Sequence, residues 1–259
     1  MSVSEVLQDW PPPVEILNAA GRSSFGLTCE HASNHVPKLY DGLGLPASDL
    51  ARHIGWDIGA AAVTRGLCER LDASGFLGGY SRLLIDLNRP LEAASSIPHR
   101  SESTDIPGNA AISDVERRRR QQEMFHPFHQ AVSHHLDQRQ QQARPTLIAA
   151  IHSFTPVFHG VSRPWHAGIL FDRDRRYGEA LIAALSRDKA LMIAANQPYV
   201  VDRSEDYTVP VHGQDRSIPA VLIEIRQDLI ADANGIAEWT DRLASALQEV
   251  ELLRSSFVE

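Results

Sequence analysis

Two histidines in this chain each follow an apolar stretch with the pattern of a β-strand. His31 comes after the segment 24–29, and His152 comes after the run 146–151. In open α/β sheets, ligands bind at the carboxyl ends of the strands, so we expect both imidazoles at one sheet edge. Imidazole is a common zinc ligand, and a catalytic zinc takes three protein ligands and a water. The pair therefore predicts a zinc site whose third ligand is a carboxylate.

Three side chains are candidates for that third ligand: Glu30, Asp57 and, as a weaker oxygen donor, Asn34. Glu30 adjoins His31 at a strand end, so its side chain is expected to point to the opposite face. Asp57 opens a predicted helix over 57–71, from where it is free to point towards the strand ends. We prefer Asp57, although an N-capping role accounts for this residue equally well.

Glu224 interrupts an apolar run, 220–225, that has the pattern of a buried strand. Burying a carboxylate without a partner is costly, so Glu224 is expected to be paired or functional. Beside a zinc-bound water, whose pKa falls to about 7, it would serve as the general base. The alternative is a salt bridge to Arg226 or to another arginine. Arg226 lies two residues on and on the same face.

Arginines near the predicted strand ends are candidates for binding a substrate carboxylate. Arg89 follows Asn88 after the extended region 76–87, and a guanidinium group binds carboxylates through two parallel hydrogen bonds. Arg82 and Arg163 are further candidates. For each of the three, a surface ion pair is the alternative.

The elements that must position these residues alternate between strands and helices. Extended patterns cover 24–29, 76–87, 146–151, 166–171, 191–195 and 220–225, and helical patterns cover 57–71, 113–142, 174–185 and 234–253. The second helix opens on the capping box Ser113-x-x-Glu116 and is expected to kink at Pro127. This alternation predicts one three-layer α/β/α domain over 1–259 with a mostly parallel or mixed sheet. Residues 1–23 resemble an N-terminal arm, and 196–219 a long loop over the site.

The composition is that of a globular protein, with 43% hydrophobic and 22% charged residues. A net charge of -8 argues against a non-specific nucleic-acid surface. No apolar run approaches the roughly 20 residues of a membrane span. The two cysteines form no disulfide framework and no signal-peptide pattern is seen, so we expect a cytoplasmic location. Nothing in the sequence specifies an oligomeric state.

Short motifs spread over most of the chain match a pattern known from zinc hydrolases. They are His31-Ala32, Trp56-Asp57, Tyr80-Ser81-Arg82, the block from Ile85 to Pro90, His126-Pro127-Phe128-His129, Ile151-His152-Ser153, Tyr207-Thr208, His212-Gly213 and Glu224. The chain resembles the N-formylglutamate amidohydrolase family, which has zinc carboxypeptidase-like architecture. The Tyr-Ser-Arg and Asp-Leu-Asn-Arg-Pro motifs are the specific part. One departure is His31-x-x-Asn34, where zinc carboxypeptidases have His-x-x-Glu.

The resemblance implies roles for particular residues. It implies zinc on His31, Asp57 and His152, with Glu224 as the general base and Arg89 as the carboxylate anchor. The remaining residues expected to bind substrate are Asn88, Arg82, Tyr207 and His212, the last two from a loop that closes over it.

The implied reaction is hydrolysis of the amide of a small N-acyl amino acid that carries a free carboxylate. N-formyl-L-glutamate, which would give glutamate and formate, is the first choice. One alternative is a deacylase or carboxypeptidase that acts on another acyl amino acid or peptide. Another is a metal-free protein that binds carboxylates without catalysis.

Overall fold

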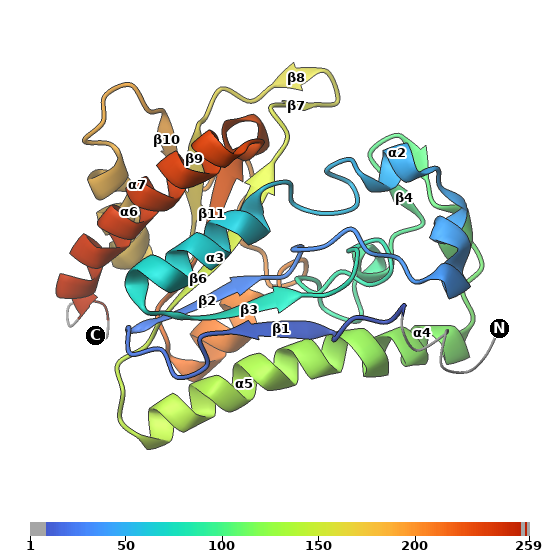
Figure 1. Ribbon diagram of the computed structural model, residues 1–259, viewed down its shortest axis with the longest axis horizontal. Helices are drawn as coiled ribbons and strands as arrows, with labels where there is room; N and C mark the ends of the chain where they lie inside the picture. The colour runs from blue at the N-terminus through green and yellow to red at the C-terminus, as the bar shows by residue number, and fades with distance from the viewer. Residues whose placement is uncertain (1–8, 255–256, 258–259) are drawn as a thin grey trace.

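The computed structural model describes residues 9–254 and 257, which form a central sheet with helices on both faces (Figure 1). Within these residues the sheet has seven strands in the order β1-β3-β2-β6-β11-β9-β10. Its strands are β1 Val14–Leu17, β2 Phe25–Cys29, β3 Ser74–Gly78, β6 Leu147–Phe154, β9 Ala167–Leu170, β10 Ile193–Ala195 and β11 Ala220–Arg226. The predicted fold class, a three-layer α/β domain with a mixed and mostly parallel sheet, is confirmed.

Four neighbouring strands, β3, β2, β6 and β11, run parallel to one another. Strand β1 is antiparallel to β3 at one edge, and β9 is antiparallel to β11 towards the other, where β10 runs parallel to β9. Two small hairpins in the described part of the chain lie outside the sheet: β4 Arg100–Ser101 with β5 Thr104–Asp105, and β7 Val157–Phe158 with β8 Val161–Ser162. The parallel strands bring their carboxyl ends, and the residues after them, to one edge of the sheet.

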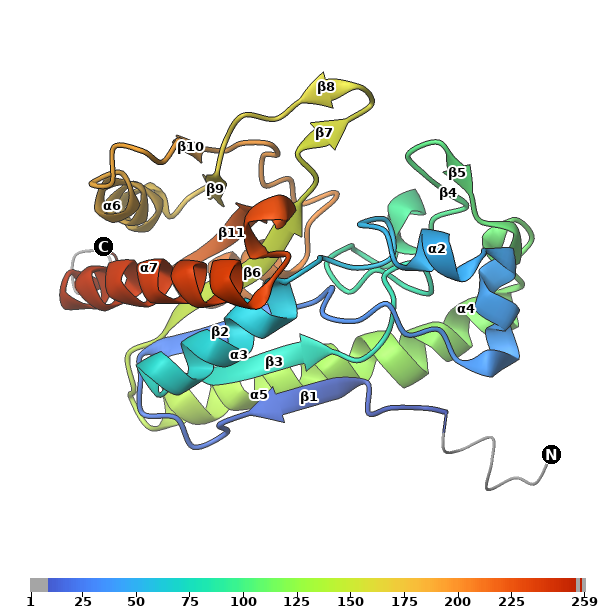
Figure 2. The same cartoon turned by 45° about the horizontal axis from the view of Figure 1, so that its top comes forward.

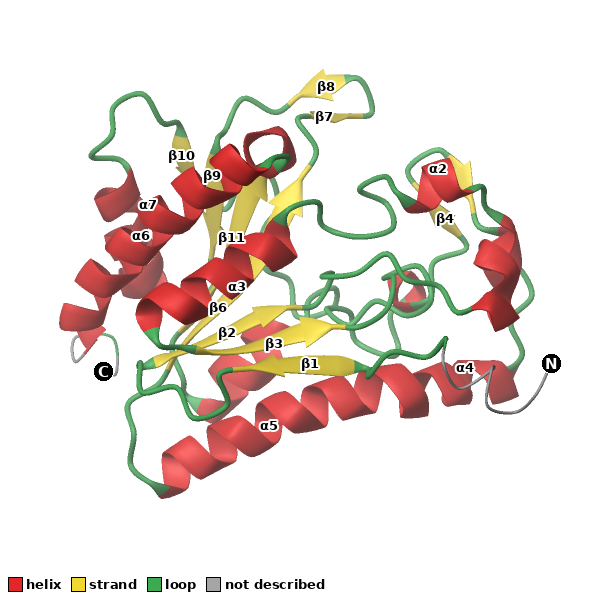
Figure 3. Ribbon diagram, viewed as in Figure 1, coloured by secondary structure: helices red, strands yellow, loops and turns green. Residues whose placement is uncertain are grey.

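The helices divide between the two faces of the sheet (Figure 3). They are α2 Ala47–Leu50, α3 Ala60–Leu71, α4 Asp114–Arg120, α5 His126–Gln141, α6 Arg175–Leu185 and α7 Ala233–Leu252. Helices α3, α6 and α7 cover one face, and α5 covers the other. None of the helices in the described residues combines the length and the apolar character needed to cross a bilayer.

The core follows the two-residue alternation of the strands. In β6, Ala149 and Ile151 pack with α7 residues such as Leu243, while Ile148 on the other face packs with Val132 of α5. Every residue of β6 is buried, as the apolar run predicts for a strand covered on both sides.

The helical segment predicted over 113–142 begins where the sequence predicts, but its interior differs from the predicted kinked α-helix. The Ser113 hydroxyl accepts from the Glu116 backbone N–H at 3.2 Å, which confirms the cap. In place of a simple kink, a π-helical stretch from Gln121 to Phe125 joins α4 to α5 just before Pro127. Proline has no backbone N–H to donate, and a π-bulge is a known way to absorb such a break.

Three predicted boundaries differ in ways that matter for the site. Strand β3 ends at Gly78, and the apolar residues that follow up to 87 lie in turns against the α5 side of the sheet. Strand β6 continues to Phe154, so His152 lies within the strand. The segment 1–23, predicted as an arm, contributes edge strand β1, whose hydrogen bonds to β3 outweigh its weak apolar pattern.

Candidate metal centre and active site

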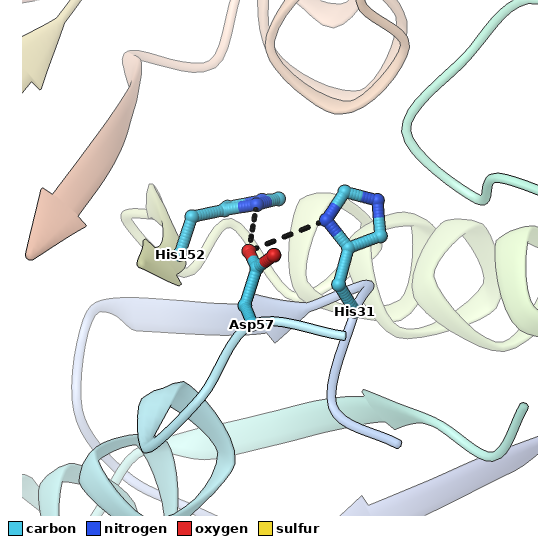
Figure 4. Close-up of side chains that lie close together, drawn as sticks. All are labelled: His31, Asp57 and His152. Atoms are coloured by element: carbon cyan, nitrogen blue, oxygen red, sulfur yellow. Dashed lines mark hydrogen bonds and ion pairs between the residues drawn. The ribbon is translucent and has the colours of Figure 1, made fainter. Parts of the chain in front are cut away.

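Three side chains from separate elements meet at the carboxyl edge of the sheet (Figure 4). His31 lies in the turn after β2, His152 in β6 and Asp57 ahead of α3. One ligand atom from each lies within 4.8 Å of the other two, and all three residues are buried. The structure thus brings together the metal ligands predicted from the sequence, and we call this set the His/Asp/His cluster.

The local folding explains why these residues meet. Strands β2 and β6 are parallel neighbours, so the ends that carry the two histidines lie side by side. The Asp57 backbone N–H donates to the His31 carbonyl at 2.9 Å, which ties the start of the α3 segment to this edge. Gly59 has a positive φ of 81°, and a Cβ there would lie 2.2 Å from the Ile230 carbonyl oxygen. Glycine therefore permits the tight turn between Asp57 and α3.

Gly59, and not Asp57, is the N-cap of α3, and Asp57 is left free to face the histidines. Asp57 Oδ2 lies 2.8 Å from His152 Nδ1 and 3.3 Å from His31 Nδ1. In Figure 4 the carboxylate sits between the two rings and interacts with both. The capping alternative for Asp57 is therefore wrong.

The outer nitrogen of each ring is held by a second carboxylate. His31 Nε2 lies 2.7 Å from Asp86 Oδ1, and His152 Nε2 lies 2.9 Å from Glu30 Oε2. Histidines that bind metals commonly pair their other nitrogen with a carboxylate, which fixes the ring and its tautomer. Glu30 thus fixes the orientation of His152. Asn34 instead donates to the Leu50 carbonyl at 3.3 Å. Neither of these alternative third ligands lies in the cluster.

Mutual attraction favours the charged forms of Asp57, His152 and Glu30 when no metal is bound. Burial alone would raise the pKa of Asp57, but the two histidines lower it well below its usual range. Burial would lower the pKa of His152, yet its contacts with Asp57 and Glu30 raise it well above the usual value. Burial opposes ionisation of Glu30 too, and the hydrogen bond and charge of His152 bring its pKa down to about 2.

The donor set fits a zinc ion. Two imidazole nitrogens and one carboxylate oxygen are a known ligand combination for catalytic zinc, with a fourth position left for water or substrate. The inner Nδ1 atoms of His31 and His152 converge on one side of the cluster, and both outer nitrogens are already occupied by carboxylates. The residues that would hold the metal are therefore His31, Asp57 and His152.

Glu224 lies beside this cluster on β11, in register with His152 on β6. It is 6% exposed, and its Oε2 has no hydrogen-bond partner among the described residues. Burial raises the Glu224 pKa to about 7, although the neighbouring His152 favours its charged form. Arg226 instead forms a 2.8 Å ion pair with Asp228, so the predicted alternative of a Glu224–Arg226 salt bridge is wrong.

A cavity of about 700 Å³ opens onto the cluster and Glu224. Its lining includes both hairpins, through Arg100 to Glu102 on one side and Phe158 on the other. The two hairpins rise on opposite sides of the carboxyl edge of the sheet in Figure 2. The volume is within the range of pockets that hold small organic ligands.

The three candidate arginines differ in the contacts that their guanidinium groups already make. Arg89 lines the cavity and forms an ion pair with Asp206 of the long loop at 3.2 Å. Arg82 also lines the cavity and pairs with Asp86 at 2.7 Å. Arg163 stacks 4.4 Å from the Phe158 ring centroid and has no carboxylate partner in the described residues.

Tyr207 and His212, which are predicted to bind substrate, lie in the part of the loop that packs on His129. His212 Nε2 is 2.8 Å from His129 Nδ1, and the Tyr207 ring packs on His129 and Phe125. Neither Tyr207 nor His212 lines the cavity. We call His129, His212, Tyr207 and Phe125 the His/aromatic cluster. Direct contact of Tyr207 and His212 with substrate stays a prediction.

Two residues of the site were not assigned a role from the sequence. Asp86 belongs to the specific Asp-Leu-Asn-Arg-Pro motif, which was the available signal, but its contact with His31 spans 55 residues. Thr208 donates to Glu30 at 2.5 Å across 178 residues. In the sequence, the Tyr207-Thr208 motif is the one signal that points to Thr208.

The fold and the site define a class: a three-layer α/β protein with a candidate metal centre beside a buried carboxylate. The model of a family described as N-formylglutamate amidohydrolase matches residues 23–231. The chain belongs to the N-formylglutamate amidohydrolase family.

Solved structures share the fold of this chain. The chain is 37% identical to gene product Atu2144 from Agrobacterium tumefaciens, with a TM-score of 0.91 over 95% of this chain and 98% of that one. It shares the fold of N-formylglutamate amidohydrolase from Ralstonia eutropha JMP134, with 15% identity and a TM-score of 0.61 over 95% and 98% of the two chains. Among curated proteins none matches the chain.

Proposed function

We propose that this chain is a zinc-dependent amidohydrolase that cleaves the amide of a small N-acyl amino acid, with N-formyl-L-glutamate as the first choice. The family supports an amidohydrolase, and the Ralstonia relative in fold carries the name of that activity. One observation carries the proposal. Glu224 is buried without a partner for Oε2, at the cavity, beside three side chains suited to hold a metal.

Glu224 acts as the proton carrier. Zinc bound by His31, Asp57 and His152 would polarise the acyl oxygen and lower the pKa of water to about 7. Oε2 of Glu224 takes a proton from the attacking water and later gives it to the leaving amine nitrogen. Burial and the unpartnered Oε2 leave this carboxylate free to accept and to release the proton at the cavity.

The substrate carboxylate is held by the arginines at the cavity. Arg89 uses Nη1 for its contacts with Asp206 and the Glu205 carbonyl, and Nη2 has no hydrogen bond within the described residues. We assign Arg89 as the anchor, with Asn88 beside it and Arg82 as a second positive charge. Fixing the carboxylate positions the scissile carbon near the cluster. Tyr207 and His212 lie outside the cavity lining, so their predicted contact with substrate would require the loop to close over it.

A hydrolysis screen tests the proposal. Purified protein loaded with zinc is assayed against N-formyl, N-acetyl and N-succinyl amino acids, each with an acidic, neutral or apolar side chain. We expect turnover of N-formyl-L-glutamate that a chelator abolishes and added zinc restores. Turnover of only another acyl group or of peptides would move the assignment to a deacylase or carboxypeptidase. Uptake of zinc without any turnover would contradict the proposal.

A further inference from the structure

The carboxylate of Glu30 connects the candidate metal ligand His152 to the long loop. One oxygen, Oε2, lies 2.9 Å from His152 Nε2, and the other, Oε1, accepts from the Thr208 hydroxyl at 2.5 Å. Glu30 is 1% exposed and Thr208 is 0% exposed, so both side chains are shielded from bulk solvent. The carboxylate is therefore oriented by its contacts with His152 and Thr208. Thr28 also favours its charged form, but the Thr28 hydroxyl makes no hydrogen bond within the described residues.

Thr208 is in turn placed by Asn88 of the Asp-Leu-Asn-Arg motif. The Asn88 side-chain oxygen accepts from the backbone N–H groups of Tyr207 at 3.2 Å and Thr208 at 3.0 Å. The amide nitrogen of Asn88 donates to Asp206 Oδ1 at 3.1 Å. Three consecutive loop residues are thus fixed to one buried asparagine, at the start of the π-helical turn η5 (Thr208–Gly213).

We propose that Thr208 is a positioning residue for the metal site, which acts through Glu30 on His152. The hydroxyl holds Glu30 so that its other oxygen accepts from His152 Nε2, and this keeps His152 Nδ1 directed at the cluster. The loop 196–219, which lines the cavity through its residues 196–202 and 205–206, is thereby linked to a metal ligand. The inference rests on the proposed function only in taking the His/Asp/His cluster as a metal site.

Removing the Thr208 hydroxyl leaves Glu30 Oε1 buried without its donor. A buried acceptor without a partner is costly, so the carboxylate is expected to turn or to lose its charge. Either change loosens the His152 ring or alters its tautomer. Loss of such an outer partner typically weakens metal binding by about 10–100-fold.

The test measures zinc affinity by competition with a chromophoric chelator, and it does not involve substrate. Thr208→Val keeps the shape of the side chain and removes the hydroxyl, whereas Thr208→Ser keeps the hydroxyl. We expect about tenfold weaker zinc binding in the valine variant and near wild-type affinity in the serine variant. Thr240→Val is the matched control, since Thr240 is buried in α7 and its hydroxyl has no partner among the described residues. This control is expected to bind zinc as the wild type does.

A double-mutant cycle shows whether Thr208 acts through Glu30. If it does, Thr208→Val adds little to the loss caused by Glu30→Gln, because the two side chains serve one contact. Wild-type affinity in Thr208→Val, equal losses in Thr208→Val and Thr240→Val, or fully additive losses in the cycle would overturn the inference. Should the valine variant not fold, Thr208→Ala takes its place, with Thr208→Ser as the rescue.

The outcome also separates this inference from the proposed function. A tenfold loss of zinc affinity in a protein that hydrolyses nothing in the screen supports the role of Thr208 and contradicts the amidohydrolase assignment. Unchanged affinity in a protein that hydrolyses N-formyl-L-glutamate contradicts the role of Thr208 alone. A wild-type protein that takes up no zinc contradicts both.

Discussion

The molecule contains two buried pairs of histidines that look alike by residue type. In the His/Asp/His cluster the rings of His31 and His152 lie 4.9 Å apart, and in the His/aromatic cluster those of His129 and His212 lie 5.1 Å apart. Both pairs lie close to the same loop and to Glu30. Their surroundings differ: carboxylates touch the first pair at Nδ1 and Nε2, while aromatic rings and a backbone carbonyl surround the second.

This difference shifts the pKa of His152 in the opposite direction to the pKa values of His129 and His212. The pKa of His152 is raised well above its usual value by Asp57 and Glu30, against the effect of burial. Burial lowers the pKa of His129 to about 3 and that of His212 to about 4. A pair of neighbouring histidines therefore becomes a candidate metal site only where carboxylates complete and orient it. The His/aromatic cluster instead has the contacts of a neutral packing unit.

The largest predicted effect concerns Glu224, the buried carboxylate beside the His/Asp/His cluster. Glu224→Gln should lower kcat by about 10²–10⁴-fold, because the amide cannot accept and return a proton. Zinc content should stay stoichiometric, since Glu224 is not among the three ligands. Steady-state kinetics and metal analysis check this. A near-normal kcat would show that the general base is another group.

Removing one ring from each pair gives the most direct contrast. His152→Ala should lose at least about a hundredfold in zinc affinity, because a three-ligand site loses one of its bonds. His129→Ala should bind zinc as the wild type does. Chelator competition on both variants, with circular dichroism as a folding control, provides the measurement. Equal losses in the two variants would erase the distinction between the clusters.

The outer carboxylate of His31 should have a smaller effect. Asp86→Asn is expected to weaken zinc binding by about tenfold, because an amide in place of the carboxylate orients the imidazole less firmly. The same competition assay measures this change. Unaltered affinity would mean that Asp86 serves Arg82, to which it is also paired, and not the metal ligand.

The smallest predicted effect is the acid sensitivity of the His/aromatic cluster. The pKa of His129 in the folded protein, about 3, lies below its ordinary value of 6.5, so below pH 6.5 the unfolded chain binds a proton that the folded chain does not. This residue therefore costs stability as the pH falls, by about 1 kcal/mol per pH unit below pH 6. Denaturant unfolding of metal-free wild type and His129→Leu between pH 7 and pH 5 should show a shallower loss in the variant. Parallel pH profiles would contradict a neutral, buried His129.

Much of the fold follows from local pattern. The apolar runs that precede His31 and His152 are strands, and the capping box at Ser113 opens a helix, because these signals depend on neighbours in sequence. Strand β1 and the β7–β8 hairpin were not predicted from the sequence. Their few residues carry little apolar alternation, and pairing with another strand stabilises them.

The residues with metal-binding or acid–base side chains could be predicted from the sequence. His31, Asp57 and His152 are brought together as expected, and an interrupted apolar run marked Glu224 as unusual. The partners Glu30, Asp86 and Thr208 could not be assigned, because their contacts join residues 55 to 178 positions apart. Which polar residue contacts the outer nitrogen of each histidine depends on tertiary packing and not on motif spacing.

The proposed function requires His31, Asp57 and His152 to hold a divalent cation beside Glu224. Anomalous diffraction at the zinc absorption edge, on crystals of the zinc-loaded protein, tests it most directly. We expect one strong peak at about 2.0–2.2 Å from both Nδ1 atoms and an Asp57 oxygen. A peak between His129 and His212 instead, or none at the His/Asp/His cluster in protein shown to contain zinc, would contradict it.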